Sequence, residues 1–203
     1  IKVPGRTDNQ VIPSFHANSR NPDDPSHNSS PWVVWNPQRR LWFLYFHFFN
    51  LKPSEPQWKE RDRFVLSKGH AAPAFYSLLS QKGYFPREEL LTFRQLNTRL
   101  QTHPEYGALP GIDFGSGSLG QGLSAALGIA LALRHQGQNA PKVCVMMGDG
   151  ESQEGQVWEG IMAGGNFGMS QLLAIVDCNK LQGEGEVKDI MDLEPLSDKW
   201  KAF

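Results

Sequence analysis

The fold is decided by the stretch Val143-Cys144-Val145-Met146-Met147-Gly148-Asp149-Gly150. It opens with a continuous apolar run, which predicts a strand buried on both faces. A polar turn follows, then a helical stretch at Val157–Asn166 and a second apolar run at Leu172–Val176. Strand, turn, helix and strand in this order predict a βαβ unit, and therefore a parallel sheet in an α/β fold.

Polar residues come directly after both predicted strands. Asp149 follows the first strand and Asn179 follows the second. Ligands of open parallel sheets bind just beyond the carboxyl ends of the strands, so we expect these two side chains to form one site. Their oxygens suit Mg²⁺, and Gly148 and Gly150 allow backbone N–H groups to approach an anion at a helix N-terminus. The alternative for the Gly-Asp-Gly turn alone is a plain connection between strand and helix.

A family resemblance favours the first interpretation. Gly148-Asp149-Gly150 followed by Asp177-Cys178-Asn179 resembles the thiamine-diphosphate motif, and the residues around it are similar to transketolases in particular. Asp192–Phe203 is similar to the same family, and the resemblance runs from about Phe43 to the last residue. It implies a three-layer α/β fold, a mostly parallel sheet with helices on both faces, together with the cofactors thiamine diphosphate and Mg²⁺.

The resemblance also implies roles for residues of the two turns. Asp149, Asn179 and the backbone carbonyl of Leu181 would hold the metal, and Gly150 would donate a backbone N–H to the diphosphate. Because the carbonyl is the expected ligand at Leu181, its side chain is free to vary.

A glycine-rich stretch, Gly115–Gly122, precedes a predicted helix at Leu123–Arg134. By itself it is a weak phosphate-binding signal, and it lacks the Lys-Ser/Thr of a P-loop. It resembles the family loop in which the residues matching Gly117 and Leu119 hold the thiazolium and aminopyrimidine region of the cofactor. Ser118 replaces the family's proline, a change that we expect to be tolerated.

Two histidines are candidate catalytic residues through the same resemblance. His70 follows a predicted strand, Phe64–Leu66, and resembles the family histidine that faces the diphosphate and the substrate. His103 stands before a proline, which holds it extended in a loop, and resembles a histidine that contacts the donor sugar. The alternatives are a structural role for His70 and a plain surface-loop position for His103. Lys68 could add positive charge nearby or be a solvated lysine.

Three carboxylates lie before or within the predicted helix that follows the Gly-Asp-Gly turn. Glu154 and Glu159 would ordinarily be surface residues, whereas the resemblance places both at the subunit interface, in a carboxylate network linking two active sites. Glu154 thereby joins the candidate catalytic residues and Glu159 the cofactor-binding ones. Glu151 is expected to be a solvated turn residue.

The remaining elements follow from periodicity and end signals. We expect helices at 41–49, 72–81 and 86–94, the last because Pro86 and acidic residues occupy its first turn. The first of these is apolar nearly all round, which predicts a buried or interface helix, and His47 within it is expected in the core or an interface.

Composition excludes several classes of function. A net charge of −1 over 203 residues gives no reason to expect nucleic acid or a membrane surface as a partner. Cys144 and Cys178 do not make a disulfide framework, so we expect buried, reduced thiols in a cytoplasmic protein. The sequence contains no apolar run long enough to span a membrane and no signal-peptide pattern, so we expect neither a transmembrane helix nor a signal peptide.

The domain prediction is an irregular arm at residues 1–40 and a thiamine-diphosphate-binding domain at residues 41–203, incomplete at its C-terminal end. Transketolases carry a His-Pro-Gly-Gly-Ser-like turn ahead of the first helix, where this chain has Ser26–Trp35 instead. Back-translating Ser30–Arg40 and reading one frame over permits a family-like turn, so we hypothesise a frame shift in the coding sequence. His27 is not assigned the role of the missing histidine.

The resemblance implies two-carbon ketol transfer between sugar phosphates as the reaction. The family's cofactor lies between this domain and a pyrimidine-binding domain or subunit, so we expect a homo- or hetero-oligomer and no independent activity. The chain could be part of a split enzyme, a fragment or a decayed gene product. Two alternatives are open: another thiamine-diphosphate enzyme, such as a dihydroxyacetone synthase or a deoxyxylulose-phosphate synthase, and a non-catalytic cofactor-binding subunit.

Overall fold

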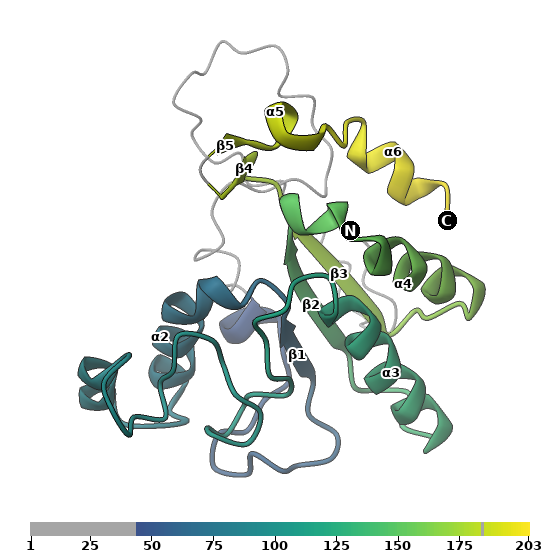
Figure 1. Cartoon of the computed structure of the whole chain (residues 1–203). Helices are drawn as coiled ribbons and strands as arrows, with labels where there is room; N and C mark the ends of the chain where they lie inside the picture. Colours follow the sequence, from purple (N-terminus) through teal and green to yellow (C-terminus); the bar gives the residue numbers. More distant parts are fainter. Residues whose placement is uncertain (1–43, 184) are drawn as a thin grey trace.

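A three-stranded parallel sheet organises the molecule. The computed structural model describes residues 44–183 and 185–203 (Figure 1). Its strands β1 (Arg63–Leu66), β2 (Val143–Gly148) and β3 (Leu172–Asp177) lie in the order β1-β2-β3, with Val143 opposite Arg63 and Leu172. The predicted parallel α/β sheet is therefore confirmed. The predictions for residues 1–43, including the N-terminal arm and the frame shift, lie outside the described residues.

The central strand β2 explains why the sheet has a core on both faces. Every residue of β2 is buried. Because side chains alternate along a strand, Val145 and Met147 pack on one face and Cys144 and Met146 on the other. β3 was also predicted to be a buried strand, but most of it is only half-buried because it is the outer strand of the described sheet.

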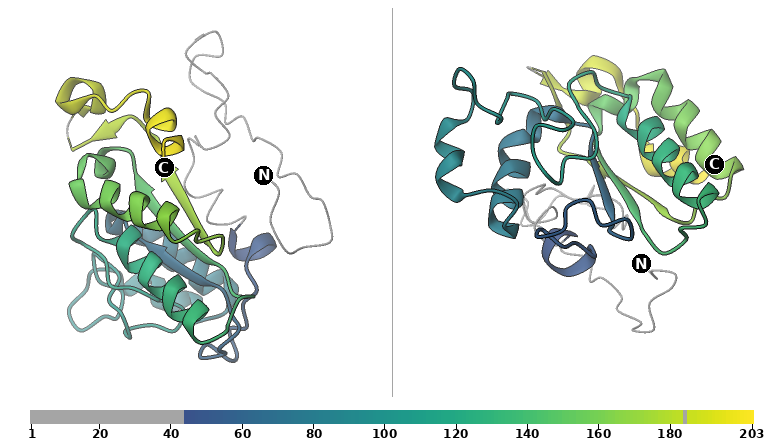
Figure 2. Two further views of the ribbon diagram at one scale, coloured as in Figure 1. Left: turned by 90° about the vertical axis from the view of Figure 1, so that its right-hand side faces the viewer. Right: turned by 90° about the horizontal axis from the view of Figure 1, so that it is seen from below.

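Helices cover both faces and complete three layers. Figure 2 shows α3 and α4 on one face of the sheet and α2 on the other, as the two hydrophobic clusters require. The helical elements between the first strand and the last are η2 (Gly69–Ala71), α2 (Ala72–Lys82), η3 (Arg87–Thr92), α3 (Gly122–His135), η4 (Gly150–Gln153) and α4 (Gly155–Asn166). The helices predicted at 72–81, 123–134 and 157–166 are confirmed to within two residues at each end.

Two predicted helices differ from expectation. The one predicted at 86–94 is the short 3₁₀ helix η3, in which no residue is fully buried, so little packing supports a longer helix. Within 41–49, the described part is a π-helical turn, η1 (Leu44–Phe48), that buries Leu44, Tyr45 and Phe48. His47 is exposed, so its predicted place in the core is wrong and a place in an interface stays a prediction.

The chain after β3 turns back across the end of the sheet. A short antiparallel hairpin, β4 (Leu181–Gln182) and β5 (Gly185–Glu186), is followed by α5 (Val187–Met191) and α6 (Leu196–Lys201) (Figure 1). In the described part of the chain, none of the helices combines the length and the apolar character needed to cross a membrane.

Candidate functional site

The turns after β2 and β3 are joined by hydrogen bonds at the end of the sheet. We call this end, formed by residues 67–70, 148–150 and 177–181, the carboxyl edge. The carboxylate of Asp149 accepts a hydrogen bond from the backbone N–H of Lys180 at 2.7 Å and another from Gly150 at 2.9 Å. The N–H of Asp149 donates to the carbonyl of Asp177 at 3.3 Å. The structure therefore brings together the two turns that the sequence predicted to share a site.

Asn179 and Leu181 lie in the same turn as Lys180. The side-chain oxygen of half-buried Asn179 accepts a hydrogen bond from the N–H of Leu181 at 2.9 Å, and the Leu181 side chain is exposed. Lys180 adopts a positive φ of 61°, which lets the chain reverse between them. The turn thus keeps the amide oxygen and the neighbouring backbone close to the Asp149 carboxylate.

The donor set of these turns is compatible with a magnesium ion. Asp149, Asn179 and the Leu181 carbonyl offer only oxygens, and each carboxylate oxygen of Asp149 accepts one backbone N–H, which leaves a further lone pair. Within residues 44–183 and 185–203, no group of three or more His, Cys, Asp or Glu side chains is placed to hold a metal. The set proposed here is of a different kind, because it combines one carboxylate with an amide oxygen and a backbone carbonyl.

Burial affects the chemistry of this turn. It raises the pKa of Asp149 above its ordinary range, although the backbone hydrogen bonds from Lys180 and Gly150 act in the opposite direction. Burial also raises the pKa of the Cys178 thiol to about 12, and the charge of Asp149 adds to this effect. Cys144 and Cys178 are both buried and free, as predicted.

A buried ion pair joins the first and third strands. Lys68 and Asp177 are 3% and 2% exposed, and Lys68 Nζ lies 2.5 Å from Asp177 Oδ2. The alternative of a solvated lysine is therefore wrong. Because β2 lies between β1 and β3, this pair spans the carboxyl edge.

His70, His103 and the glycine-rich stretch lie together beside that edge. We call residues 115–122 the glycine loop. A Cβ added to Gly69 would stand 2.8 Å from Ser116 Oγ, 3.0 Å from His103 Cδ2 and 3.1 Å from the backbone nitrogen of Gly117. The N–H of Ser116 also donates to the carbonyl of Pro104 at 3.0 Å, which fixes the loop against the segment that carries His103.

His70 extends from the first turn after β1 and is exposed in part. Partial burial of its ring lowers the pKa of His70, and the positive charge of Lys68 lowers it further. His103 also lowers it, as expected for two imidazoles that lie near each other. At neutral pH, His70 is therefore a neutral imidazole that can accept or donate a proton.

Close packing explains the glycines of the loop better than flexibility does. Gly120 has φ of +83°, and a Cβ there would stand 2.6 Å from the Cβ of Glu154. A Cβ on Gly122 would stand 2.3 Å from Ser67 Oγ. The loop is thus pressed between the end of β1 and the start of α4, as the predicted close backbone approach requires.

Glu151 corrects the sequence-based expectation. It was expected to be a solvated turn residue, but it is 4% exposed. Its carboxylate accepts hydrogen bonds from the backbone N–H of Gly120 at 2.8 Å and of Gly148 at 3.0 Å, and from the hydroxyl of Ser67. The sequence carries no clear signal for this role, because residue 148 is a glycine and not the Ser or Thr of a capping box, and the other donors come from distant segments.

The remaining predicted site residues, Leu119, Glu154 and Glu159, lie outside the two turns. Glu154 is exposed but packs against Gly120, and Leu119 is 40% exposed at the outside of the loop. Glu159 is exposed further along α4. The structure therefore places Glu154 beside the glycine loop, while Glu159 stands apart from the two turns.

Unsatisfied polar atoms gather at the carboxyl edge. In the part of the chain that the structure describes, five side-chain atoms are buried without a hydrogen-bond partner, and three of them lie at or beside this edge: Ser116 Oγ, Asp177 Oδ1 and Gln182 Oε1. A Cβ on Gly150 would stand 3.0 Å from Gln182, so the glycine leaves just enough room for that side chain. Buried polar atoms normally have partners. Asp177 Oδ1 and Gln182 Oε1 can only accept hydrogen bonds, so they suit a water molecule or a cation, whereas the Ser116 hydroxyl can also donate to an anion.

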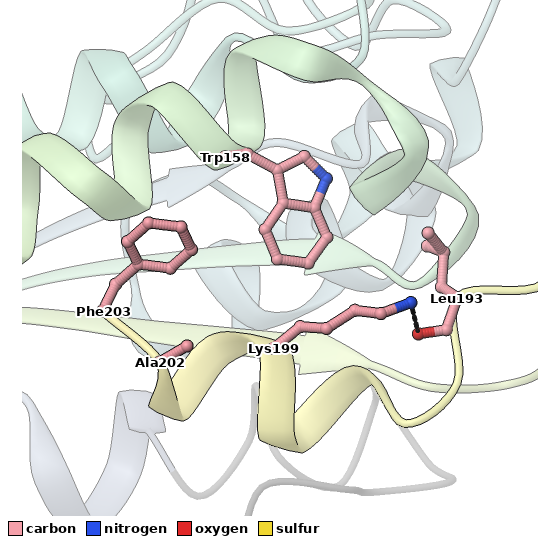
Figure 3. Close-up of a pocket in the computed structure, with 5 residues that line it drawn as sticks. All are labelled: Trp158, Leu193, Lys199, Ala202 and Phe203. Atoms are coloured by element: carbon pink, nitrogen blue, oxygen red, sulfur yellow. Dashed lines mark hydrogen bonds between the residues drawn. The ribbon is translucent and has the colours of Figure 1, made fainter.

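An apolar hollow lies away from this edge. It has a volume of about 370 Å³ and is lined by Trp158 of α4 and by Leu193, Lys199, Ala202 and Phe203 near the C-terminus. Figure 3 shows Trp158 and Phe203 facing each other across it, with Lys199 donating a hydrogen bond to the Leu193 carbonyl at 2.8 Å. It includes none of the predicted site residues.

The sequence of the chain decides its family. Residues 40–203 match the family described as "Transketolase, thiamine diphosphate binding domain". The chain belongs to this family. The resemblance seen in the Gly-Asp-Gly and Asp-Cys-Asn turns is thereby confirmed.

Curated relatives are named as parts of transketolases. The chain is 48% identical over 161 residues to a protein named 6-deoxy-6-sulfo-D-fructose transketolase subunit, from a Clostridium strain, and this match covers 79% of the chain and 58% of the relative. It is 41% identical to a protein of Phocaeicola vulgatus that is named as a subunit of apulose-4-phosphate transketolase, covering 79% of the chain and 56% of that protein. The chain thus spans little more than half the length of these relatives.

Solved transketolases have the same fold. The transketolase of Leishmania mexicana is 32% identical, with a TM-score of 0.74 over 79% of this chain and 25% of that one. The transketolase of Campylobacter jejuni is also 32% identical, with a TM-score of 0.71 over 78% of this chain and 26% of that one. The predicted thiamine-diphosphate-binding fold is confirmed.

Proposed function

We propose that this chain is the diphosphate-binding part of an enzyme that transfers a two-carbon ketol unit between sugar phosphates, with thiamine diphosphate and Mg²⁺ as cofactors. The observation that carries the proposal is the hydrogen bond between Asp149 and Lys180, which holds the two polar turns together at the end of the sheet. Membership of the transketolase family supports the choice of cofactor and reaction class.

The two turns would hold the metal and the diphosphate. Asp149, Asn179 and the Leu181 carbonyl would bind Mg²⁺ through oxygens alone, as that ion prefers. In the structure, the N–H of Gly150 donates to Asp149 Oδ1, so a diphosphate oxygen would compete for that N–H. The side chain of Gln182 lies next to Gly150, and its oxygen Oε1, which has no hydrogen-bond partner, could accept a hydrogen bond from a water molecule at this site.

The glycine loop and the two histidines would face the reacting end of the cofactor. Gly117 and Leu119 would pack against its rings, and His70 and His103 would orient the sugar and handle protons and developing charge. The chemistry that thiamine diphosphate supplies when bound is nucleophilic attack on a ketose carbonyl and storage of the electron pair. A neutral His70 at physiological pH is suited to accept a hydroxyl proton.

The proposal includes a partner that carries the pyrimidine-binding domain. The relatives named as transketolase subunits support this, because a subunit works with another chain. We assign residues 41–203 to the diphosphate-binding domain and place Glu154 and Glu159 at the interface with that partner, in a homo- or hetero-oligomer. The two buried free thiols favour a reducing compartment, which we propose to be the cytoplasm.

Turnover tests the proposal. The full chain would be mixed with the C-terminal half of a transketolase, thiamine diphosphate and Mg²⁺, and supplied with a ketose phosphate, or with 6-deoxy-6-sulfofructose, and an aldose phosphate acceptor. Ketol transfer that needs both proteins is expected, and Asp149→Asn should abolish it while Asp189→Asn, an exposed aspartate of α5, should not. Cofactor binding without transfer from any of these donors would contradict a catalytic role.

A further inference from the structure

Glu151 connects three segments that are far apart in the sequence. Oε1 of its carboxylate accepts from the Gly120 N–H in the glycine loop and from the Ser67 hydroxyl after β1, and Oε2 accepts from the Gly148 N–H at the end of β2. All three contacts are buried, and Glu151 is itself 4% exposed. A buried carboxylate with three donors is a fixed point of the structure, because losing a donor would leave charge unsatisfied.

Ser67 reinforces the same connection. Its hydroxyl oxygen accepts a hydrogen bond from the Gly122 N–H at 3.1 Å while its proton goes to Glu151. The two N–H groups that frame the end of the glycine loop, at Gly120 and Gly122, are therefore both held by the Ser67–Glu151 pair. Leu119 and Gly117 lie directly before this anchored end.

We propose that Glu151 is a positioning residue that sets the glycine loop at its distance from the diphosphate turn. This inference rests on the proposed function, in which Gly117 and Leu119 face the rings of the cofactor. Glu151 lies in the turn after Asp149, so a single side chain fixes the loop that faces the rings to the turn that faces the diphosphate. The residue itself touches neither metal nor substrate.

The role requires a carboxylate and not merely a residue of the same size. An ionised carboxylate accepts hydrogen bonds at both oxygens, whereas a glutamine side chain has one oxygen and one NH₂ group. In Glu151→Gln, the NH₂ group would face a backbone N–H, either at Gly148 or at Gly120. One of the two connections would therefore be broken with almost no change in volume.

The first experiment compares two ligands on the full chain by calorimetry, with Mg²⁺ present. Thiamine diphosphate would contact both the loop and the diphosphate turn, and inorganic pyrophosphate would contact the turn alone. Glu151→Gln should weaken thiamine diphosphate about 10-fold or more, as the loss of a charge-assisted hydrogen bond predicts. Pyrophosphate affinity should change by less than about 2-fold, because the hydrogen bonds that hold Asp149 and Asn179 in the diphosphate turn do not involve Glu151.

Glu88→Gln is the matched control, since Glu88 is exposed on η3. It should leave both affinities unchanged. Equal weakening of both ligands by Glu151→Gln, or no weakening of either, would overturn the inference. If the unaltered chain binds neither ligand, even with the C-terminal half of a transketolase added, the proposed function fails, and a second measurement decides the role of Glu151 by itself.

That measurement is amide hydrogen exchange of the full chain without ligand. In Glu151→Gln and in Ser67→Ala, exchange should become faster in residues 117–122 and stay as in the Glu88→Gln control in β2 and β3. Unchanged exchange in the loop, or an equal increase in the strands, would mean that Glu151 does not set the loop's position.

Discussion

Lys68 and Asp177 form an ion pair across the full width of the described sheet, with Nζ and Oδ2 2.5 Å apart. Lys68 follows β1, Asp177 ends β3, and β2 lies between them. Both side chains are almost completely buried. The pair therefore fixes the spacing of the strand ends from which the candidate site is built.

Removing one partner of this pair should be costly. In Lys68→Met, the Asp177 carboxylate would stay buried without its cation, and we expect a loss of about 3–5 kcal/mol in the free energy of unfolding. Urea denaturation of the full chain measures it, with the exposed Lys59→Met as control. A loss no greater than the control's, within about 0.5 kcal/mol, would show that the pair contributes little.

Two glycines should respond in opposite directions to alanine. Gly120→Ala introduces a Cβ 2.6 Å from the Cβ of Glu154 at a positive φ, so we expect a loss of about 1–3 kcal/mol. Gly128 lies within α3 with nothing within 4 Å of an added Cβ, so Gly128→Ala should gain about 0.5–1 kcal/mol. Thermal unfolding of both variants tests this, and a stabilising Gly120→Ala would refute the tight packing of the loop.

The pH dependence of stability should reveal His70. Its pKa in the folded chain lies below the ordinary value of 6.5, because burial and Lys68 disfavour the charged form. The unfolded chain then binds the proton at a higher pH, so this contribution to stability is complete above 6.5 and is lost as pH falls through that value. NMR titration of the imidazole should give a pKa below 6.5, and His70→Gln should lose less stability between about pH 7.5 and about pH 5.5. An imidazole that titrates at or above 6.5 would be inconsistent with the packing around it.

The thiol of Cys178 should report whether the metal turn stays closed. Because burial raises the pKa of this thiol to about 12, it is protonated and covered at neutral pH. We expect no reaction with a thiol reagent until the chain unfolds in urea. Rapid modification of Cys178 in the absence of denaturant would mean that the turn opens in solution.

Much of the fold could be predicted from local patterns. The apolar run Val143–Met147 identifies β2 because a strand buried on both faces needs no alternation, and the helix between it and the next run makes the pairing parallel. Asp149 and Asn179 were predicted to meet because strand ends of a parallel sheet lie at one edge. The hydrogen bond from Lys180 to Asp149 confirms that the two turns meet.

What the sequence did not reveal depends on contacts between distant segments. Glu151 stands in a polar turn, and only the approach of Ser67 and Gly120 buries it. Lys68 can likewise be buried only because Asp177 of a different strand pairs with its charge. The helix predicted at 86–94 had the expected residues in its first turn, but none of its residues is fully buried, so little packing supports it and it forms only a 3₁₀ helix.

The most direct measurement is calorimetric titration of thiamine diphosphate into the full chain, with and without Mg²⁺ and with and without a transketolase C-terminal half. We predict binding that needs Mg²⁺, tightens with the partner, and weakens by at least about 10-fold in Asp149→Asn but not in Asp189→Asn. Absence of Mg²⁺-dependent binding under every condition would contradict the proposal that these two turns form a thiamine-diphosphate site.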